Sequence, residues 1–138
     1  MIPKNFILEE FVPKEIFVSR GSMAWSLLDE RIIITAETIR EYFKKKVIIN
    51  NWKWNGPFSQ RGLRTDKSMN DKAPYSQHIF GRAIDFDVDG IHAEEVRQSV
   101  LQNKDKFPYI TGMELDVNWV HIDCRFLHNQ ARIKLFKA

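Results

Sequence analysis

Two histidines and one aspartate have the types and the spacing of a metal site. His78 lies seven residues before Asp85, and Gly81 stands between them in the segment SQHIFGRAID, residues 76–85. A glycine in such a loop lets the backbone turn, so that an imidazole and a carboxylate can converge on one point. His121 lies in a separate segment. Two imidazoles and one carboxylate suit zinc and leave a fourth position for water, which is typical of catalytic zinc sites.

The cysteine count narrows the metal chemistry. Cys124 is the only cysteine among the 138 residues, which excludes an intrachain disulfide framework and a multi-cysteine zinc site. Any metal must therefore be held by histidine and carboxylate. A single histidine or aspartate is more often a surface or structural residue, so the pattern as a whole carries the hypothesis.

Two segments of alternating polarity must present these side chains. Residues 82–88 alternate, and Asp85 falls on their polar face. Residues 119–124 alternate in the same way, with His121 and Asp123 on the polar face. If both apolar faces pack inward, the polar residues are left at a surface or a site. Asp123 is then placed to orient the imidazole of His121, with an exposed strand charge as the alternative.

The remaining segments predict helices around one sheet. Apolar residues recur at steps of three and four over residues 25–43, which predicts a long amphipathic helix with Gly21-Ser22 at its N-terminus. A second helix is predicted from residue 93 to about 104, further strands at 47–49, 110–115 and 133–136, and an irregular loop over 55–76. These elements indicate an α+β fold, a mainly antiparallel sheet with helices packed on one side.

Length and composition set the wider limits. A chain of 138 residues fits one domain, 1–138, because a core of this size buries roughly two-thirds of the unfolded surface. The net charge of +3 comes with no nucleic-acid-binding motif, so a small basic nucleic-acid-binding protein is only a distant alternative. The start has no apolar signal region, and no stretch of about 20 apolar residues follows. We therefore expect synthesis in the cytoplasm and no nucleic-acid or membrane partner.

The pattern S-x-H-x-x-G-x-A-x-D over residues 76–85, followed by WVHID at 119–123, resembles the M15 peptidases. That family includes D-Ala-D-Ala carboxypeptidases, D,D-dipeptidases and phage L-alanyl-D-glutamate endolysins. The likeness extends to the segment RGLR, which occupies the place of the family's Ser-Gly-Tyr-Arg, and to Asn70 at the place of a frequent asparagine. Arg61 departs from the family, since serine is usual at its position.

The resemblance implies a site and a function. By position, His78, Asp85 and His121 become zinc ligands, and Arg64 binds a substrate carboxylate with its planar fork or steadies the oxyanion. A solvated loop charge is the alternative for Arg64. The implied protein is a monomeric zinc peptidase of hedgehog/D-Ala-D-Ala peptidase-like fold that cuts peptidoglycan stem peptides, acting on the cell wall after phage-type release. Because ligating imidazoles must be neutral, zinc affinity should fall below about pH 6.

The catalytic acid is less clear from the sequence. Many M15 members carry Glu or Asp three residues before the last histidine, where this chain has Asn118, and asparagine cannot take a proton. Glu114 and Asp116 are the nearby acids. A two-residue turn at 117–118 would place Glu114 opposite His121, and Asp116 would then start the turn. We favour Glu114, with Asp116 as the second candidate, and a zinc-binding module without peptidase activity as the alternative function.

Overall fold

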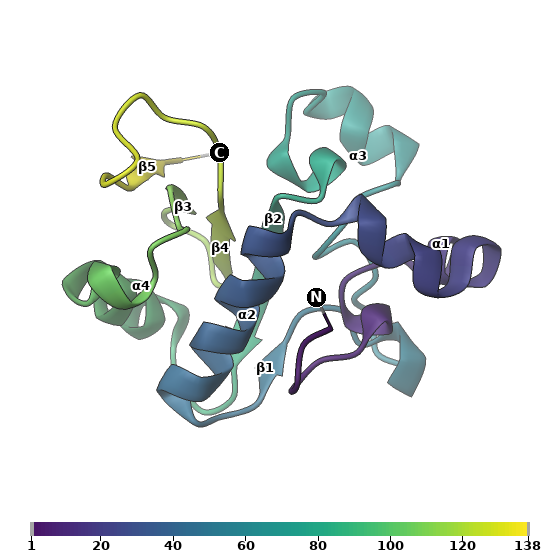
Figure 1. Cartoon of the computed structure of the whole chain (residues 1–138), viewed down its shortest axis with the longest axis horizontal. Coiled ribbons are helices and arrows are strands. Elements are labelled where there is room, and N and C mark those ends of the chain that lie inside the picture. Colours follow the sequence, from purple (N-terminus) through teal and green to yellow (C-terminus); the bar gives the residue numbers. More distant parts are fainter. Residues whose placement is uncertain (1, 138) are drawn as a thin grey trace.

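The computed structural model describes residues 2–137 and shows helices packed against a five-stranded sheet (Figure 1). The α-helices are α1 (Lys14–Arg20), α2 (Glu30–Phe43), α3 (Lys67–Lys72) and α4 (Ala93–Gln102). The strands are β1 (Val47–Ile48), β2 (Ala83–Val88), β3 (Gly112–Glu114), β4 (Val120–Asp123) and β5 (Lys134–Phe136). Short 3-10 helices are η1 (Leu8–Glu10), η2 (Gly21–Leu27), η3 (Trp52–Trp54), η4 (Gln77–Phe80) and η5 (Lys104–Lys106). The α+β class predicted from the sequence is confirmed.

The sheet is mixed rather than purely antiparallel. Its strand order is β1-β2-β4-β3-β5, and the first three neighbouring pairs are antiparallel. The edge strand β5 runs parallel to β3. The chain passes from β3 to its parallel partner β5 through β4 and the connecting residues 124–133. The C-terminal segment therefore returns to the sheet beside β3.

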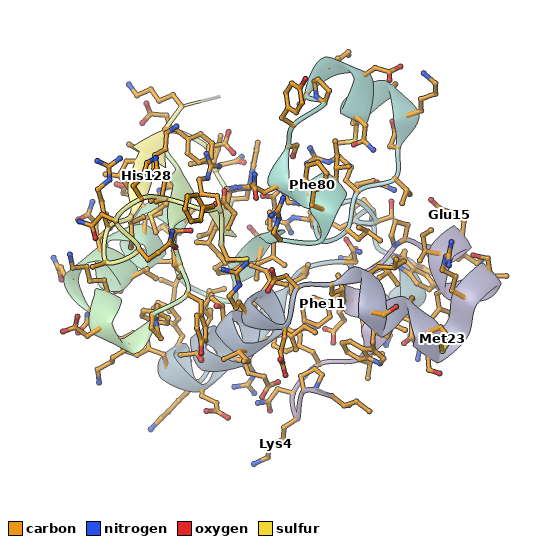
Figure 2. The ribbon with its side chains drawn as sticks, turned by 45° about the horizontal axis from the view of Figure 1, so that its top comes forward. Lys4, Phe11, Glu15, Met23, Phe80 and His128 are labelled. Carbon is orange, nitrogen blue, oxygen red and sulfur yellow. The ribbon has the colours of Figure 1, made fainter. Side chains whose placement is uncertain are left out.

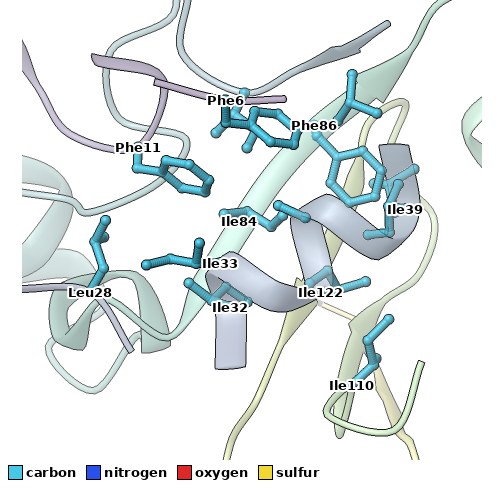
Figure 3. Close-up of a cluster of buried hydrophobic side chains, with 14 of the residues drawn as sticks. Phe6, Phe11, Leu28, Ile32, Ile33, Ile39, Ile84, Phe86, Ile110 and Ile122 are labelled. Carbon is cyan, nitrogen blue, oxygen red and sulfur yellow. The ribbon is translucent and has the colours of Figure 1, made fainter. Parts of the chain in front are cut away.

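One face of the sheet carries the core. Alternation puts the apolar residues of β2 and β4 on this face, where they meet α2 and α4. Figure 1 shows α2 running across the sheet. Figure 3 shows part of this cluster, which includes the buried side chains Ile32, Ile39, Ile84, Phe86, Val96, Val100 and Ile122. The opposite face is thus left for the polar residues of the same strands.

The long helix starts later than the sequence predicted. The apolar spacing indicated residues 25–43, but η2 occupies Gly21–Leu27 and α2 begins at Glu30. The N-cap is Asp29, whose side chain accepts a hydrogen bond of 3.0 Å from the backbone N–H of Arg31. The expected cap at Gly21-Ser22 was wrong.

A long-range backbone contact explains the break. Leu28 is extended, with φ −107° and ψ 138°, so the helical path stops there. The N–H of Asp29 donates to the carbonyl of Gly81 at 2.9 Å. Gly81 has φ +67°, and a Cβ at this position would lie 3.0 Å from Cα of Leu28. The approach of the two segments requires glycine at position 81.

Other boundaries differ by smaller amounts. The loop predicted over 55–76 contains the short helix α3, capped by Asp66, whose carboxylate accepts from the N–H of Met69 at 3.0 Å. The second long helix ends at Gln102. Within residues 2–137, no helix combines the length and the apolar character that crossing a membrane requires.

The position of the cap can be tested by stability. Asp29→Ala should lower the free energy of unfolding by about 1 kcal/mol, because the N-cap hydrogen bond to α2 is lost. Ser22→Ala, at the cap position suggested by sequence alone, should change it by less than about 0.5 kcal/mol, as exposed substitutions usually do. Urea unfolding of both variants measures the difference. Equal effects would contradict the assignment of Asp29 as the cap.

Candidate metal centre

One transverse row of the sheet carries four candidate site residues. Asp85 of β2 pairs with His121 of β4, and Glu114 of β3 pairs with Phe136 of β5. The β3–β4 register pairs Met113 with Ile122, so Glu114 comes next, opposite His121. All four row residues lie on the face away from the helical core. This register agrees with the position inferred from the sequence for Glu114 and His121. The two-residue turn expected at 117–118 was wrong, because residues 115–119 all lie between β3 and β4 and the positive φ falls at Asp116.

His78 reaches this row from the preceding loop. It lies in η4, where the hydroxyl of Ser76 accepts from the N–H of His78 at 3.3 Å and Gly81 ends the turn. Its ring Nδ1 lies 2.9 Å from the carbonyl oxygen of Gly62. A carbonyl only accepts, so Nδ1 carries the proton and Nε2 presents its lone pair to the site. The backbone thereby fixes both the tautomer and the direction of the ring.

The three predicted ligands converge. His78 Nε2 lies 3.1 Å from Asp85 Oδ1 and 3.2 Å from His121 Nδ1. His121 Nδ1 lies 2.8 Å from the same Asp85 oxygen. The three side chains are buried and form the one group of three potential metal ligands found within residues 2–137.

The donor set fits zinc. Two atoms that each lie about 2.0–2.1 Å from a tetrahedral zinc are about 3.3 Å apart, so outward shifts of a few tenths of an ångström would admit the ion. Two imidazole nitrogens and one carboxylate oxygen are ligands that zinc accepts. No fourth protein ligand closes the group within the described part of the chain, as in sites that keep a position for water.

Behind His121 stands a buried carboxylate. Asp123 has no exposed surface, and its Oδ2 lies 2.8 Å from Nε2 of His121. The structure thus places Asp123 where it can orient the imidazole, as the shared strand face indicated. An exposed strand charge, the alternative reading of Asp123, was wrong.

These contacts shift the ionisation of the group. Burial works against ionisation of Asp85, but the neighbouring His78 and His121 hold its pKa well below its usual range. Burial likewise lowers the pKa of His121, yet hydrogen bonds and charges from Asp123 and Asp85 outweigh this and raise it to about 9. Asp123 is held to a pKa of about 2, because Arg125 and His121 outweigh its desolvation. The two carboxylates thus favour the protonated form of the His121 imidazole.

The ligand group opens into a hollow of about 350 Å³. Arg64 lines it, and its Nη2 lies 3.9 Å from Asp85 Oδ2 while its buried Nε has no partner within residues 2–137. Asn70 donates from Nδ2 to the carbonyl of Arg64 at 3.2 Å, which holds this part of the loop. Arg64 is thus no solvated loop charge. The other residues that line the hollow include Tyr75, Gln77, Glu114, Trp119, Arg125 and Phe136.

The two candidate acids are in different places. Glu114 is buried at the wall of the hollow, and none of the side-chain hydrogen bonds or ion pairs within residues 2–137 involves its carboxylate. Asp116 is exposed in the turn with φ +62°, and its carboxylate lies 3.0 Å from Nζ of Lys137. It does not line the hollow. Asn118 is also exposed and lines an adjoining hollow.

Sequence reasoning missed Arg125 and Phe136. Arg125 continues the alternation of Trp119, His121 and Asp123, which was the available signal for its direction. Phe136 had no comparable signal, because its approach depends on the parallel pairing of β5 with β3. Arg61, at a position where the resemblance implies serine, pairs instead with Asp87 at 3.1 Å.

Comparison with known proteins identifies the family of this chain. A family model described as Peptidase M15 matches residues 5–123. The chain belongs to the M15 peptidase family. No curated protein and no solved structure matches it. Residues 124–137, with Arg125 and β5, lie beyond the matched span.

Metal content tests the ligand set. The purified protein should carry about one zinc per chain after dialysis, and His78→Ala or His121→Ala should remove it, because each deletes one of three ligands. His92→Ala and His128→Ala are matched controls, since both histidines are exposed and His128 lies on the loop before β5 (Figure 2). Elemental analysis reads the result. Zinc retained in both ligand variants would refute the site.

The pH dependence of metal binding follows from the pKa of His121. Because a metal must displace a proton from an imidazole with a pKa of about 9, binding should release this proton at all pH values below 9. The apparent affinity should rise about tenfold per pH unit between pH 6 and 8 and level off above 9. Because the two carboxylates raise the pKa of His121, the loss of zinc affinity should begin at a higher pH than the value of about 6 expected from the sequence. Chelator-competition titrations at pH 6, 7 and 8 measure it, and constant affinity over this range would contradict it.

Proposed function

We propose that the protein is a zinc-dependent peptidase that hydrolyses peptide bonds of peptidoglycan stem peptides, as a D-Ala-D-Ala carboxypeptidase or an endolysin-like enzyme. Membership in the M15 family supports the peptidase role. The observation that carries the zinc chemistry is the convergence of His78, Asp85 and His121 at the base of the hollow. The stem-peptide substrate rests on the resemblance of the motifs.

His78, Asp85 and His121 are the residues that would hold the zinc. When bound there, zinc supplies Lewis acidity, which polarises the scissile carbonyl and makes water a nucleophile near neutral pH. The protein supplies the orientation of the ligands. The carbonyl of Gly62 fixes His78, and Asp123 fixes His121.

Glu114 is the proposed general base. It stands opposite His121 across the β3–β4 pair, at the wall of the hollow. Its carboxylate takes a proton from the attacking water and returns it to the leaving amine. Residues in β4 and β5 flank it, so the carboxylate is held on a paired strand.

Arg64 is the proposed substrate-binding residue. Its guanidinium lines the same hollow and has donor capacity left over, since Nε has no partner within residues 2–137. A planar guanidinium binds a carboxylate by two parallel hydrogen bonds. Arg64 thereby anchors a substrate carboxylate, or steadies the oxyanion that forms at the scissile carbonyl.

Asn118 motivates a second candidate function. The position three residues before His121, acidic in many relatives, is here an exposed asparagine outside the hollow. A zinc-binding module that has lost peptidase activity would have this feature. Digestion of purified peptidoglycan by the zinc-loaded protein, with products identified by mass, separates the two. Zinc binding without any cleaved peptide favours the module.

Paired variants test the base. Glu114→Gln should retain zinc and the fold but lose a hundredfold or more in peptide hydrolysis, the order that general base catalysis contributes. Asp116→Asn should cost far less, because asparagine also suits a turn position with positive φ. Steady-state hydrolysis of stem peptides measures both variants. Loss of activity in Asp116→Asn, with Glu114→Gln nearly unaffected, would reverse the assignment.

A further inference from the structure

His121, Asp123, Arg125 and Phe136 form a closed ring of four side chains, each in contact with the next. Asp123 Oδ2 lies 2.8 Å from Nε2 of His121. Arg125 donates to both oxygens of Asp123, from Nε at 2.7 Å and from Nη2 at 2.6 Å. The Arg125 guanidinium lies 4.5 Å from the ring centre of Phe136. The Phe136 ring in turn meets the His121 ring edge-on, at 5.5 Å and 83°.

The backbone makes room for this ring. Gly112 of β3 pairs with Asp123 of β4, directly beneath the Asp123–Arg125 contact. A Cβ at Gly112 would lie 2.6 Å from Arg125 Nε and would overlap Oδ1 of Asp123. A side chain at this position would force the Asp123 carboxylate and the Arg125 guanidinium to shift.

The edge strand β5 positions Phe136, the fourth residue of the ring. β5 holds Phe136 beside Glu114 through the parallel ladder, and the N–H of Leu115 donates to the carbonyl of Phe136 at 2.7 Å. Phe136 and Arg125 both line the hollow. Both stand beyond residues 5–123, the span matched to the family. This part of the site therefore comes from the chain's own C-terminal segment.

The contacts of the ring fix the orientation of the His121 imidazole. A buried carboxylate is costly unless its lone pairs are satisfied, and the guanidinium fork satisfies Asp123 while fixing its plane. The fixed carboxylate leaves one direction for the N–H of His121 Nε2, so Nδ1 must face His78 and Asp85. Edge contact with Phe136 limits rotation of the imidazole. Metal binding then needs no reorientation of this ligand.

We propose that Arg125 and Phe136 are positioning residues that hold His121 in its metal-ligating tautomer and orientation, so that the C-terminal strand is part of the metal centre. The inference rests on the proposed zinc site. Arg125 acts through Asp123, and Phe136 acts on the imidazole itself.

Metal affinity tests this role without any need for catalysis. Arg125→Gln and Phe136→Ala should each weaken zinc binding ten- to hundredfold in competition with a chromophoric chelator, the usual effect of removing a partner of a ligand. Arg125→Lys should recover only part of the loss, because an ammonium cannot engage both oxygens in one plane. The absorption spectrum of the cobalt(II)-loaded variants should also change, since the ligand field follows the orientation of His121.

Matched controls separate positioning from general damage. Arg132→Gln removes an exposed positive charge from the same segment, and Leu135→Ala truncates a neighbour of Phe136 that is 46% exposed. Both should bind zinc like the wild type. Gly112→Ala keeps all four members of the ring but displaces Asp123 and Arg125, so it should also weaken zinc binding.

The outcomes are distinct. Wild-type zinc affinity and an unchanged cobalt spectrum in Arg125→Gln and Phe136→Ala would overturn the inference, even if these variants unfold more easily. A wild type that binds zinc but cleaves no stem peptide would overturn the proposed function, while the affinities would still decide the positioning role. A wild type that binds neither zinc nor cobalt would overturn both.

Discussion

The antiparallel pairing of β2 with β4 is the constraint on which both the core and the candidate site depend. It places Ile84 beside Ile122 on the helical face and Asp85 beside His121 on the other. Each fully buried apolar side chain contributes about 1.5–3 kcal/mol. A slip of one residue would turn these side chains outward and bury the polar ones. Burial in the core therefore holds Asp85 and His121 side by side without any contribution from a metal.

The same register buries two carboxylates on the polar face of the sheet. Asp85 and Asp123 are both buried, and a buried charge is costly unless it is paired and hydrogen-bonded. His121 stands between the two carboxylates, Arg125 satisfies the outer one, and His78 and Arg64 approach the inner one. The low pKa of Asp123 and the high pKa of His121 are two sides of this arrangement. The contacts that neutralise the buried carboxylates thus also orient the side chains of the candidate metal site.

Features that depend on neighbouring residues in the sequence could be predicted, whereas features that depend on contacts between distant segments could not. The strands around Asp85 and His121 could be predicted because alternation is a local signal, and the convergence of the ligands followed from their motif. The start of α2 could not, since the break at Leu28 depends on a contact with Gly81 from a distant loop. The position of Phe136 could not be predicted either, because it depends on the long-range pairing of β5 with β3. The identity of the ligands and the catalytic acid stays a prediction, as does the single domain over 1–138.

The C-terminal strand β5 and Glu114, the proposed base, are joined through the sheet. An acid at position 118 would stand in an exposed turn, whereas Glu114 lies on a strand paired on both sides. Without β5, the strand carrying Glu114 would be the edge of the sheet, and its unpaired backbone would be free to fray. The pairing that brings Phe136 to His121 also fixes the backbone of Glu114. The backbone of Glu114, the proposed base, is therefore paired with a strand that lies outside residues 5–123, the span matched to the family.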